Sequence, residues 1–274
     1  MEKLFSIIVV CLNPGEKLGQ TINSIVSQTF NDYEIIIKDG GSSDGSLNIL
    51  SEFKDADIRL LEGPDKGIYD AMNAALLNAR GRYIYFLNCG DILASDDVLY
   101  GISESIAGFE KECPDKEAIF YGNIYERHSK STVMSNPVMN EFGCYRNVPC
   151  HQACFYKRSL IEKHLFDLDY KVRADYEQFL WCFLNKGAKT RYVDITVADY
   201  EGDGYSESRP GIALSKQEHR RITAKYMSRK KIFKYRLLML ISLSGLRSAM
   251  AKSSLLSGVY NGIKKAVYKR KKNI

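Results

Sequence analysis

The 274-residue chain lacks the paired cysteine spacing of a disulfide framework or a zinc site. Its seven cysteines are odd in number and scattered, which indicates free thiols in a reducing compartment. The apolar run at residues 236–246 has only about half of the roughly 20 residues that a membrane-spanning helix needs. Asn13-Pro14-Gly15 follows the apolar start of the chain, where a secretory signal would have a small-residue cleavage site. We therefore expect a cytoplasmic protein.

Two phosphate-binding motifs are also missing. No GxGxxG follows the first predicted strand, and no GxxxxGK[ST] occurs anywhere, so dinucleotide-binding and P-loop functions lose their main support. A nucleotidyltransferase would carry a glycine-rich, basic phosphate loop after that strand, and CLNPGEKLG at residues 11–19 matches such a loop poorly. A nucleotidyltransferase with a related sheet remains an alternative.

Acidic residues are nearly absent from the C-terminal quarter. Residues 211–274 hold 17 basic residues and one acid, Glu218, whereas residues 1–210 hold 22 bases and 32 acids. Such asymmetry indicates a polyanionic partner, either nucleic acid or an anionic membrane. Nucleic acid would leave the acidic body unexplained, so we expect no nucleic-acid partner. We predict a catalytic domain at 1–210 and a basic amphipathic helical tail at 211–274 that lies on a membrane surface.

Apolar runs alternate with helical patterns through the first half of the chain. This alternation predicts an α/β fold with a doubly wound, mostly parallel sheet, whose ligands bind beyond the carboxyl ends of the strands. Helical patterns return in the second half and after Pro210. The predicted strands are 4–12, 33–37, 58–61, 83–87 and 119–125, and the predicted helices are 18–30, 46–53, 68–79, 157–163 and 176–184.

Polar motifs follow these strands in a fixed order: IIVVCLN, EIIIKDGGSSDGS, GPDKGIYDAMNAAL, YIYFLNCGD and KVRADYEQFLW. Together they resemble the family 2 glycosyltransferases over residues 4–205. The resemblance implies a GT-A fold, which is a Rossmann-like nucleotide-diphospho-sugar transferase fold. It also implies inverting transfer of a hexose or N-acetylhexosamine from a nucleotide sugar, with UDP favoured.

The resemblance also implies roles for individual residues. Asp91 is the expected ligand of a divalent cation, Mn²⁺ or Mg²⁺, because hard cations prefer oxygen. The sequence departs from the family at Met72, where many members carry Arg, and at Asn88, where an acid is usual. The expected donor-binding residues are Leu12, Asn13, Asp39, Asp44, Asp65, Lys66, Gly67, Asp70, Asn73 and Asn88.

Asp175 occupies the position of the family's general base, which removes the proton of the acceptor hydroxyl. Ala174 stands where the family usually has Glu, and a surface helix cap is the alternative interpretation of Asp175. The grouping of Cys144, Cys150, His151 and Cys154 leaves a zinc site as another alternative. The expected acceptor-side residues are His151, Gln152, Gly204, Tyr205 and Ser206.

From this resemblance we expect an enzyme of cell-surface polysaccharide synthesis, peripheral on the inner face of a bacterial membrane. Its acceptor would be a saccharide carried on polyprenyl diphosphate. The basic tail would hold the enzyme near anionic lipid, because each Lys or Arg close to such a surface contributes on the order of 1 kcal/mol. A non-catalytic membrane-associated binding protein is the remaining alternative.

Overall fold

A nine-stranded sheet forms the centre of the protein in the computed structural model, which describes residues 2–202 and 208–241. The strand order is β3-β2-β1-β4-β8-β6-β9-β5, and β7 pairs with β6 outside this path. The α/β class predicted from the sequence is confirmed. The strands are β1 (Phe5–Cys11), β2 (Tyr33–Asp39), β3 (Ile58–Glu62), β4 (Tyr83–Phe86), β5 (Ile92–Leu93), β6 (Ala118–Glu126), β7 (Ser131–Val133), β8 (Cys154–Lys157) and β9 (Lys189–Tyr200).

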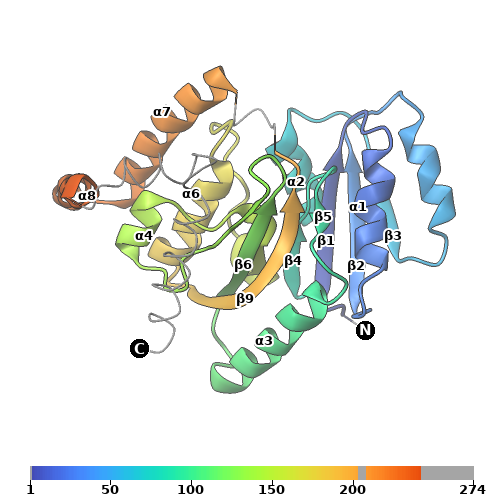
Figure 1. Ribbon diagram of the computed structural model, residues 1–274, viewed down its shortest axis with the longest axis horizontal. Coiled ribbons are helices and arrows are strands. Elements are labelled where there is room, and N and C mark those ends of the chain that lie inside the picture. The colour runs from blue at the N-terminus through green and yellow to red at the C-terminus, as the bar shows by residue number, and fades with distance from the viewer. Residues whose placement is uncertain (1, 203–207, 242–274) are drawn as a thin grey trace.

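Helices cover both faces of the sheet. Figure 1 shows α4, α6, α7 and α8 gathered at one end of the molecule, away from α1 and β3 at the other end. The α-helices are α1 (Lys17–Val26), α2 (Ile68–Leu76), α3 (Val98–Glu112), α4 (Glu141–Arg146), α5 (Arg158–Ile161), α6 (Ala174–Leu180), α7 (Arg209–Tyr226) and α8 (Arg229–Ile241). Three shorter helical segments are η1 (Ser46–Glu52), η2 (His151–Ala153) and η3 (Trp181–Asn185).

The first half of the chain forms the predicted parallel β-α-β arrangement. β1 pairs in parallel with β2 and β4, and β2 pairs in parallel with β3. Every residue of β1, β2 and β4 is buried, which explains why these strands are continuous apolar runs instead of alternating patterns. The carboxyl ends of these strands meet at one edge of the sheet, and the loops that follow them lie there.

Successive side chains of β1 enter two separate cores. Phe5, Ile7 and Val9 pack with residues of α1 and α3 on one face of the sheet. Ile8 and Val10 pack with residues of α2, α6 and α7 on the other face. This alternation fixes the strand register, because a slip by one residue would exchange the two sets of side chains.

Several elements in both halves of the chain differ from the prediction. β8 precedes the helix predicted at 157–163 and lies antiparallel between β4 and β6, and only Arg158–Ile161 of that stretch is α-helical. The 12-residue strand β9 and the helix α3 were not predicted. At 46–53 the chain forms the 3-10 segment η1, in which no residue is fully buried. Without a buried face, an amphipathic α-helix has little tertiary packing to stabilise it.

The chain beyond residue 210 packs against the body as α7 and then α8. α7 buries Gly211, Glu218, Ile222 and Thr223, so this first part of the predicted tail belongs to the folded core. Residues 242–274 of that tail lie outside the described residues. Among residues 2–202 and 208–241, every helix is too short or too polar to cross a membrane.

Candidate active site

Leu12, Asn13 and Asp44 lie together where the loops after β1 and β2 meet. The Asn13 N–H donates to Ser42 Oγ at 2.7 Å, and Asp44 Oδ2 accepts from the Gly15 N–H at 2.9 Å. Asn13 has a φ of +47°, a left-handed conformation that asparagine adopts more readily than most residues. The Leu12 side chain is 60% exposed beside these bonds. The two loops therefore form one joined rim.

Asp39 shapes the loop after β2. Its residue is 1% exposed, its Oδ2 accepts from the N–H groups of Gly41 and Ser42 at 2.8 Å each, and its Oδ1 accepts from the Ser42 hydroxyl. Burial acts to raise the pKa of Asp39, but the hydrogen bonds from Ser42 and Gly41 outweigh it and hold the pKa below its ordinary value. Asp39 is thus an ionised residue bonded to its own loop, and its direct contact with a nucleotide stays a prediction.

Lys38 joins the loops after β2 and β3, although the sequence analysis did not select it. Its Nζ donates to the carbonyl oxygens of Asp39 and Gly63 and lies 3.6 Å from Asp65 Oδ2. A Cβ on Gly40 would lie 2.7 Å from Asp65 Oδ2, so a larger residue there would displace the Asp65 carboxylate. A lysine inside a fully buried strand was the signal in the sequence that pointed to this contact.

Asp65, Lys66, Gly67 and Asp70 form one turn that leads into α2. Asp65 Oδ1 accepts from the Gly67 N–H, and Asp70 Oδ2 accepts from the Lys66 N–H, both at 2.9 Å. The Lys66 residue is exposed beside these bonds. Four of the predicted donor-binding residues therefore stand on one short segment, next to the loop that Asp39 shapes.

Asn73 bonds to the chain itself. Its Nδ2 donates to the Phe166 carbonyl at 2.9 Å, its Oδ1 accepts from the Phe166 N–H at 2.8 Å, and the residue is 8% exposed. These two bonds tie α2 to the segment that precedes α6. Its predicted contact with the donor is untested, and the tie between the two segments is what the geometry provides.

Asp91 lies in the loop after β4, as predicted, and is 3% exposed. Its Oδ2 accepts from Gln152 Nε2 at 3.0 Å and its Oδ1 from the Glu201 N–H at 2.9 Å. Burial raises the pKa of Asp91 above its ordinary value. Gln152, expected on the acceptor side, is 2% exposed and holds the candidate metal ligand. Gly90 has a φ of +102°, which favours glycine, and a Cβ there would also lie 2.5 Å from Glu201 Oε2.

A chain of polar contacts joins three of the predicted motifs. Asn88 Nδ2 lies 3.2 Å from His151 Nε2, and His151 Nδ1 lies 3.5 Å from Asp175 Oδ2. Asn88 Oδ1 is buried and has no partner among the described residues.

The Asp175 carboxylate is held on a second side by Tyr69, whose hydroxyl donates at 3.1 Å. Burial acts to raise the pKa of Asp175, but the hydrogen bond and charge interaction with His151 outweigh it, so the pKa lies below its ordinary value. The side chain remains 24% exposed. Asp175 is therefore ionised, oriented and accessible, which a surface helix cap does not require. Tyr69 was missed because an aromatic residue in a helix usually belongs to the core.

The cysteines near His151 are thiols in buried surroundings. Burial raises the pKa of Cys144 and of Cys150 to about 12. Within the part of the chain that the structure describes, no group of three or more His, Cys, Asp or Glu residues is placed to hold a metal ion. The predicted acceptor-side residues Gly204, Tyr205 and Ser206 lie outside the described residues.

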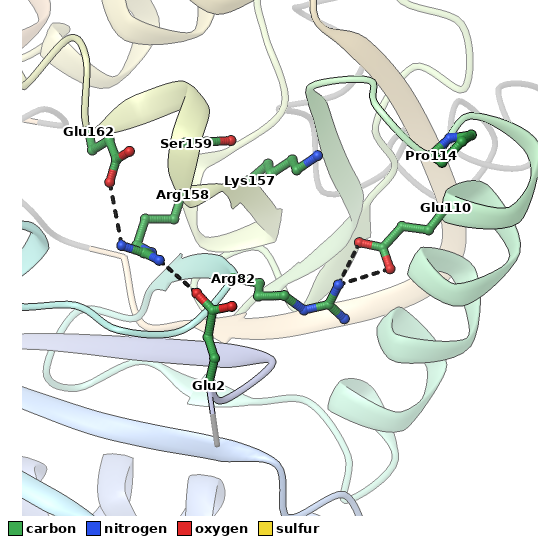
Figure 2. A pocket seen from close by; sticks show the side chains of 8 residues that line it. All are labelled: Glu2, Arg82, Glu110, Pro114, Lys157, Arg158, Ser159 and Glu162. Atoms are coloured by element: carbon green, nitrogen blue, oxygen red, sulfur yellow. Dashed lines mark hydrogen bonds and ion pairs between the residues drawn. The ribbon is translucent and has the colours of Figure 1, made fainter.

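Figure 2 shows a pocket of about 420 Å³ that is separate from this site. It adjoins Arg82, which precedes β4, and therefore lies at the amino end of a strand whose carboxyl end leads to Asp91. Its charges are paired, because Arg82 contacts Glu110 at 3.0 Å and Arg158 contacts Glu2 at 2.7 Å. Both arginines of this pocket are thus paired with carboxylates and offer no unpaired charge to a ligand.

An α/β sheet with carboxylates in the loops after neighbouring strands, and an ionised carboxylate on a facing helix, defines a glycosyltransferase of the GT-A class. The chain belongs to glycosyl transferase family 2, whose model matches residues 6–165. It is 34% identical over 205 residues to a PGL/p-HBAD biosynthesis glycosyltransferase of Mycobacterium bovis, covering 73% of this chain and 78% of that protein. The chain is thus a transferase.

Other similar proteins agree with this class. Over 205 residues the chain is 32% identical to WfaP of Escherichia coli, a UDP-Glc:α-D-GlcNAc-diphosphoundecaprenol β-1,3-glucosyltransferase, covering 72% of this chain and 77% of WfaP. Two solved structures share the fold. The mannosyltransferase PcManGT of Pyrobaculum calidifontis, solved with GDP-Man and Mn²⁺, has a TM-score of 0.64 at 17% identity over 98% of this chain and 83% of its own. Staphylococcus aureus TarS with UDP-GlcNAc has a TM-score of 0.61 at 18% identity over 78% and 64%.

Proposed function

We propose that the protein transfers a hexose or N-acetylhexosamine from a UDP-sugar to a hydroxyl of a saccharide acceptor, with inversion at the anomeric carbon. The contacts of two consecutive residues carry this proposal. His151 contacts Asp175 and Asn88, while Gln152 donates to Asp91. An accessible carboxylate thereby stands beside the loop in which the resemblance places the donor diphosphate.

Asp175 is the proposed general base. In a single displacement, it takes the proton of the acceptor hydroxyl while that oxygen attacks the anomeric carbon from the face opposite the nucleotide. The lowered pKa keeps the carboxylate charged at neutral pH. His151 and Tyr69 each occupy one side of it, and a carboxylate has about four lone-pair sites, so acceptor positions remain for the hydroxyl.

The joined loops after β1, β2 and β3 are the proposed donor site. The exposed Leu12 side chain offers an apolar surface to a nucleotide base, and the Lys66 residue is exposed at the neighbouring loop. Solved proteins of similar fold hold UDP-GlcNAc or GDP-Man, which supports a nucleotide sugar as the ligand of this edge. The preference for UDP rests on the family resemblance and on the donor named for WfaP.

A divalent cation, Mn²⁺ or Mg²⁺, fits the oxygen atoms present at the loop after β4. Asp91 has lone pairs beyond the two that accept from Gln152 and Glu201, and Asn88 Oδ1 is a buried oxygen without a partner among the described residues. These two side chains would hold the ion, together with oxygens of the donor diphosphate. Such an ion would offset the charge that develops on the leaving nucleotide.

The acceptor we propose is a saccharide linked through diphosphate to a polyprenyl lipid at the inner face of the membrane, in cell-surface polysaccharide or glycolipid synthesis. The name of WfaP specifies such an acceptor for that relative. In this chain, α8 supports a membrane location, because Phe233, Leu240 and Ile241 are 72%, 74% and 69% exposed and basic residues stand among them. An anionic membrane surface is thus the proposed second partner.

Replacing Asp175 by Asn tests the proposal. We expect Asp175→Asn to lower transfer by about 10² to 10⁴-fold, the usual contribution of a general base. Donor binding should persist, measured as the rise in melting temperature with UDP-sugars and Mn²⁺. A ligand present at 100 times its Kd stabilises the folded state by about 2.7 kcal/mol, so the shift is readily measured.

Asp169→Asn is the matched control, because Asp169 is an exposed carboxylate in the segment before α6. It should leave both transfer and donor binding unchanged. If only GDP-sugars raise the melting temperature, the proposed donor would be a GDP-sugar instead of a UDP-sugar. Loss of donor binding in Asp175→Asn would remove Asp175 from the role of base, and a protein stabilised by no nucleotide sugar would overturn the function.

A further inference from the structure

A second concave surface lies beside α6 and carries charge of one sign. The cleft has a volume of about 620 Å³ and is formed by the end of α4, the residue before α6, one face of α7 and a residue of α8. Five of its eight lining residues are basic and none is acidic. They are Tyr145, Arg146, Arg173, Lys216, His219, Arg220, Thr223 and Arg236.

The basic side chains of this cleft are not neutralised by carboxylates within the part of the chain that the structure describes. Arg173 donates to Ser215 Oγ at 2.7 Å and lies 3.5 Å from Asn147 Oδ1, both uncharged groups. The Arg146 guanidinium stands 6.0 Å from the ring centre of Phe142. The arginines of the pocket in Figure 2, by contrast, are paired with glutamates.

The architecture of α7 keeps its acid away from the cleft. Lys216 and Arg220 are one turn apart on the same face, an arrangement of like charges that destabilises a helix by a few tenths of a kcal/mol. Glu218, the only acid of this helix, is 1% exposed and accepts from the N–H groups of Lys171, Val172 and Arg173. A bound polyanion would relieve the repulsion that Glu218 does not offset.

The floor of the cleft is ordered and uncharged. His219 Nε2 donates to the Tyr145 carbonyl at 2.8 Å, and the imidazole stacks on the Tyr176 ring at 5.2 Å between centres. Burial lowers the pKa of His219, so this imidazole is neutral at neutral pH. The positive charge therefore resides on the flexible walls, where side chains can close around a ligand.

The cleft adjoins the proposed base. Arg173 lines the cleft, precedes Asp175 by two residues and is one of the charges that lower its pKa. On the far side, Arg236 lines the cleft while its neighbours Leu237 and Leu238 are 50% and 37% exposed. A ligand seated here would thus have Asp175 on one side and an apolar helix face on the other.

We propose that this cleft binds the diphosphate that joins the acceptor saccharide to its lipid, with Arg146, Arg173, Lys216, Arg220 and Arg236 as the anion-binding side chains. The inference rests on the proposed function and adds the recognition site for its substrate. Arginine presents paired donors that match phosphate oxygens, and charge-assisted hydrogen bonds are the stronger kind. The saccharide would extend from the diphosphate toward Asp175, and the lipid would pass along α8.

Binding of farnesyl diphosphate to the full chain, compared with farnesol, tests the site without a transfer reaction. UDP is kept saturating so that the donor site is filled. We expect farnesyl diphosphate to bind and farnesol not to bind measurably. Lys216→Gln/Arg220→Gln should weaken the binding of farnesyl diphosphate at least about tenfold, because charge-assisted hydrogen bonds to the diphosphate are lost.

The charge-matched control is Lys111→Gln/Lys116→Gln, which removes two exposed positive charges at the end of α3 and before β6 that do not line the cleft. It should bind farnesyl diphosphate like the unchanged protein. Equal weakening by both double variants would overturn the inference, because the effect would then be one of net charge. So would unchanged binding in Lys216→Gln/Arg220→Gln.

Transfer assays separate this inference from the proposed function. With a diphosphate-linked GlcNAc acceptor, Lys216→Gln/Arg220→Gln should raise KM at least about tenfold with kcat nearly unchanged, and with octyl GlcNAc it should change neither constant.

If the unchanged protein transfers sugar but the variant shows no KM effect, the cleft inference fails and the function stands. If the variant loses only its binding to phosphatidylglycerol vesicles, the cleft binds lipid headgroups and the inference is overturned. If no sugar nucleotide supports any transfer, the function itself fails.

Discussion

At the scale of single residues, Asp91 is held by hydrogen bonds from two segments that are distant from it in sequence. It must be ionised to hold a cation, yet burial raises its pKa, and two hydrogen bonds from Gln152 and from the Glu201 N–H act against that rise. Metal-dependent donor binding should therefore be lost as the pH falls through the raised pKa, at a higher pH than an ordinary aspartate would give. The neighbouring residues, and not Asp91 alone, set this limit.

Gln152→Leu should move that limit further. Leucine fills similar space but removes the hydrogen bond to Asp91 Oδ2, so the pKa of Asp91 should rise further. The measurement is the pH midpoint of the Mn²⁺-dependent thermal shift with UDP-sugar. Gln152→Glu places a second carboxylate there and should shift the midpoint more. An unchanged midpoint in both variants would mean that another group titrates.

The sequence identified positions better than contacts at this scale. The family resemblance assigned Asp91, His151 and Asp175 to one site. They could not show that Asn73 bonds to Phe166 or that Asp39 is enclosed by its own loop, because both depend on chain paths far apart in sequence. Tyr69 was hidden for the same reason, since Asp175 lies 106 residues further along the chain.

At the scale of elements, α7 orients the helix that carries the proposed base. Glu218 accepts three N–H groups at 2.7–3.0 Å from residues 171–173, the segment that opens α6. These N–H groups precede the first helical residue, Ala174, so the buried carboxylate satisfies backbone donors of the segment that leads into α6. The single acid of the basic segment thus anchors this segment, although composition alone presented it as an exception.

Glu218→Gln should reduce both stability and catalysis. An amide has one acceptor oxygen and directs an NH₂ group at the N–H donors, so the free energy of unfolding should fall by about 2 kcal/mol. Because Asp175 loses its fixed orientation, kcat should fall while the thermal shift with donor persists. Gln217→Ala, at the exposed neighbour, is the control. A normal kcat in a less stable Glu218→Gln protein would mean that the Glu218 contacts serve folding only.

Prediction of elements succeeded where the strands are parallel and buried on both faces. The runs at β1, β2 and β4 are mainly apolar, and their polar residues are Ser6, Glu34, Lys38 and Asp39. β8 was missed because it has four residues and leads directly into α5. β9 alternates polar and apolar residues only over residues 193–197, VDITV, a short period of two that was not used.

At the scale of the whole molecule, α8 has two apolar faces. Ile232, Tyr235 and Met239 pack against the core, whereas Phe233, Leu237 and Leu240 are 72%, 50% and 74% exposed at intervals of four and three residues. A helix on a water-soluble surface usually keeps its outer face polar. The outer face of α8, with Lys230, Lys231 and Lys234 nearby, matches a helix that lies in a lipid interface.

Phe233→Asn/Leu237→Asn/Leu240→Asn should weaken binding to phosphatidylglycerol vesicles, because exposed apolar area contributes about 25 cal/mol per Å² when it is buried. Sedimentation at low and high salt measures the effect and separates it from charge attraction. Leu77→Asn/Val133→Asn removes apolar area elsewhere and should not alter sedimentation. Equal vesicle binding by all three proteins would exclude the outer face of α8 as a membrane contact.

The division of charge along the chain described the whole molecule only in part. Residues 211–241 were expected to stand apart as a tail, and this domain boundary is a prediction that no comparison tests. α7 nevertheless packs Ile222 into the same core cluster as α2 and α6. Net charge reports on surfaces and partners, and it carries little information about which helix packs on which sheet.

The two bonds of Asp91 span 61 and 110 residues of sequence. During synthesis on the ribosome, the loop after β4 emerges long before Gln152 and Glu201. The Asp91 carboxylate is therefore synthesised before the residues that bond to it. Binding of the nucleotide-sugar donor should therefore appear only after β9 has been synthesised. Nascent chains that end earlier should not bind the donor. Activity would then begin as a step rather than a gradual rise along the growing polypeptide.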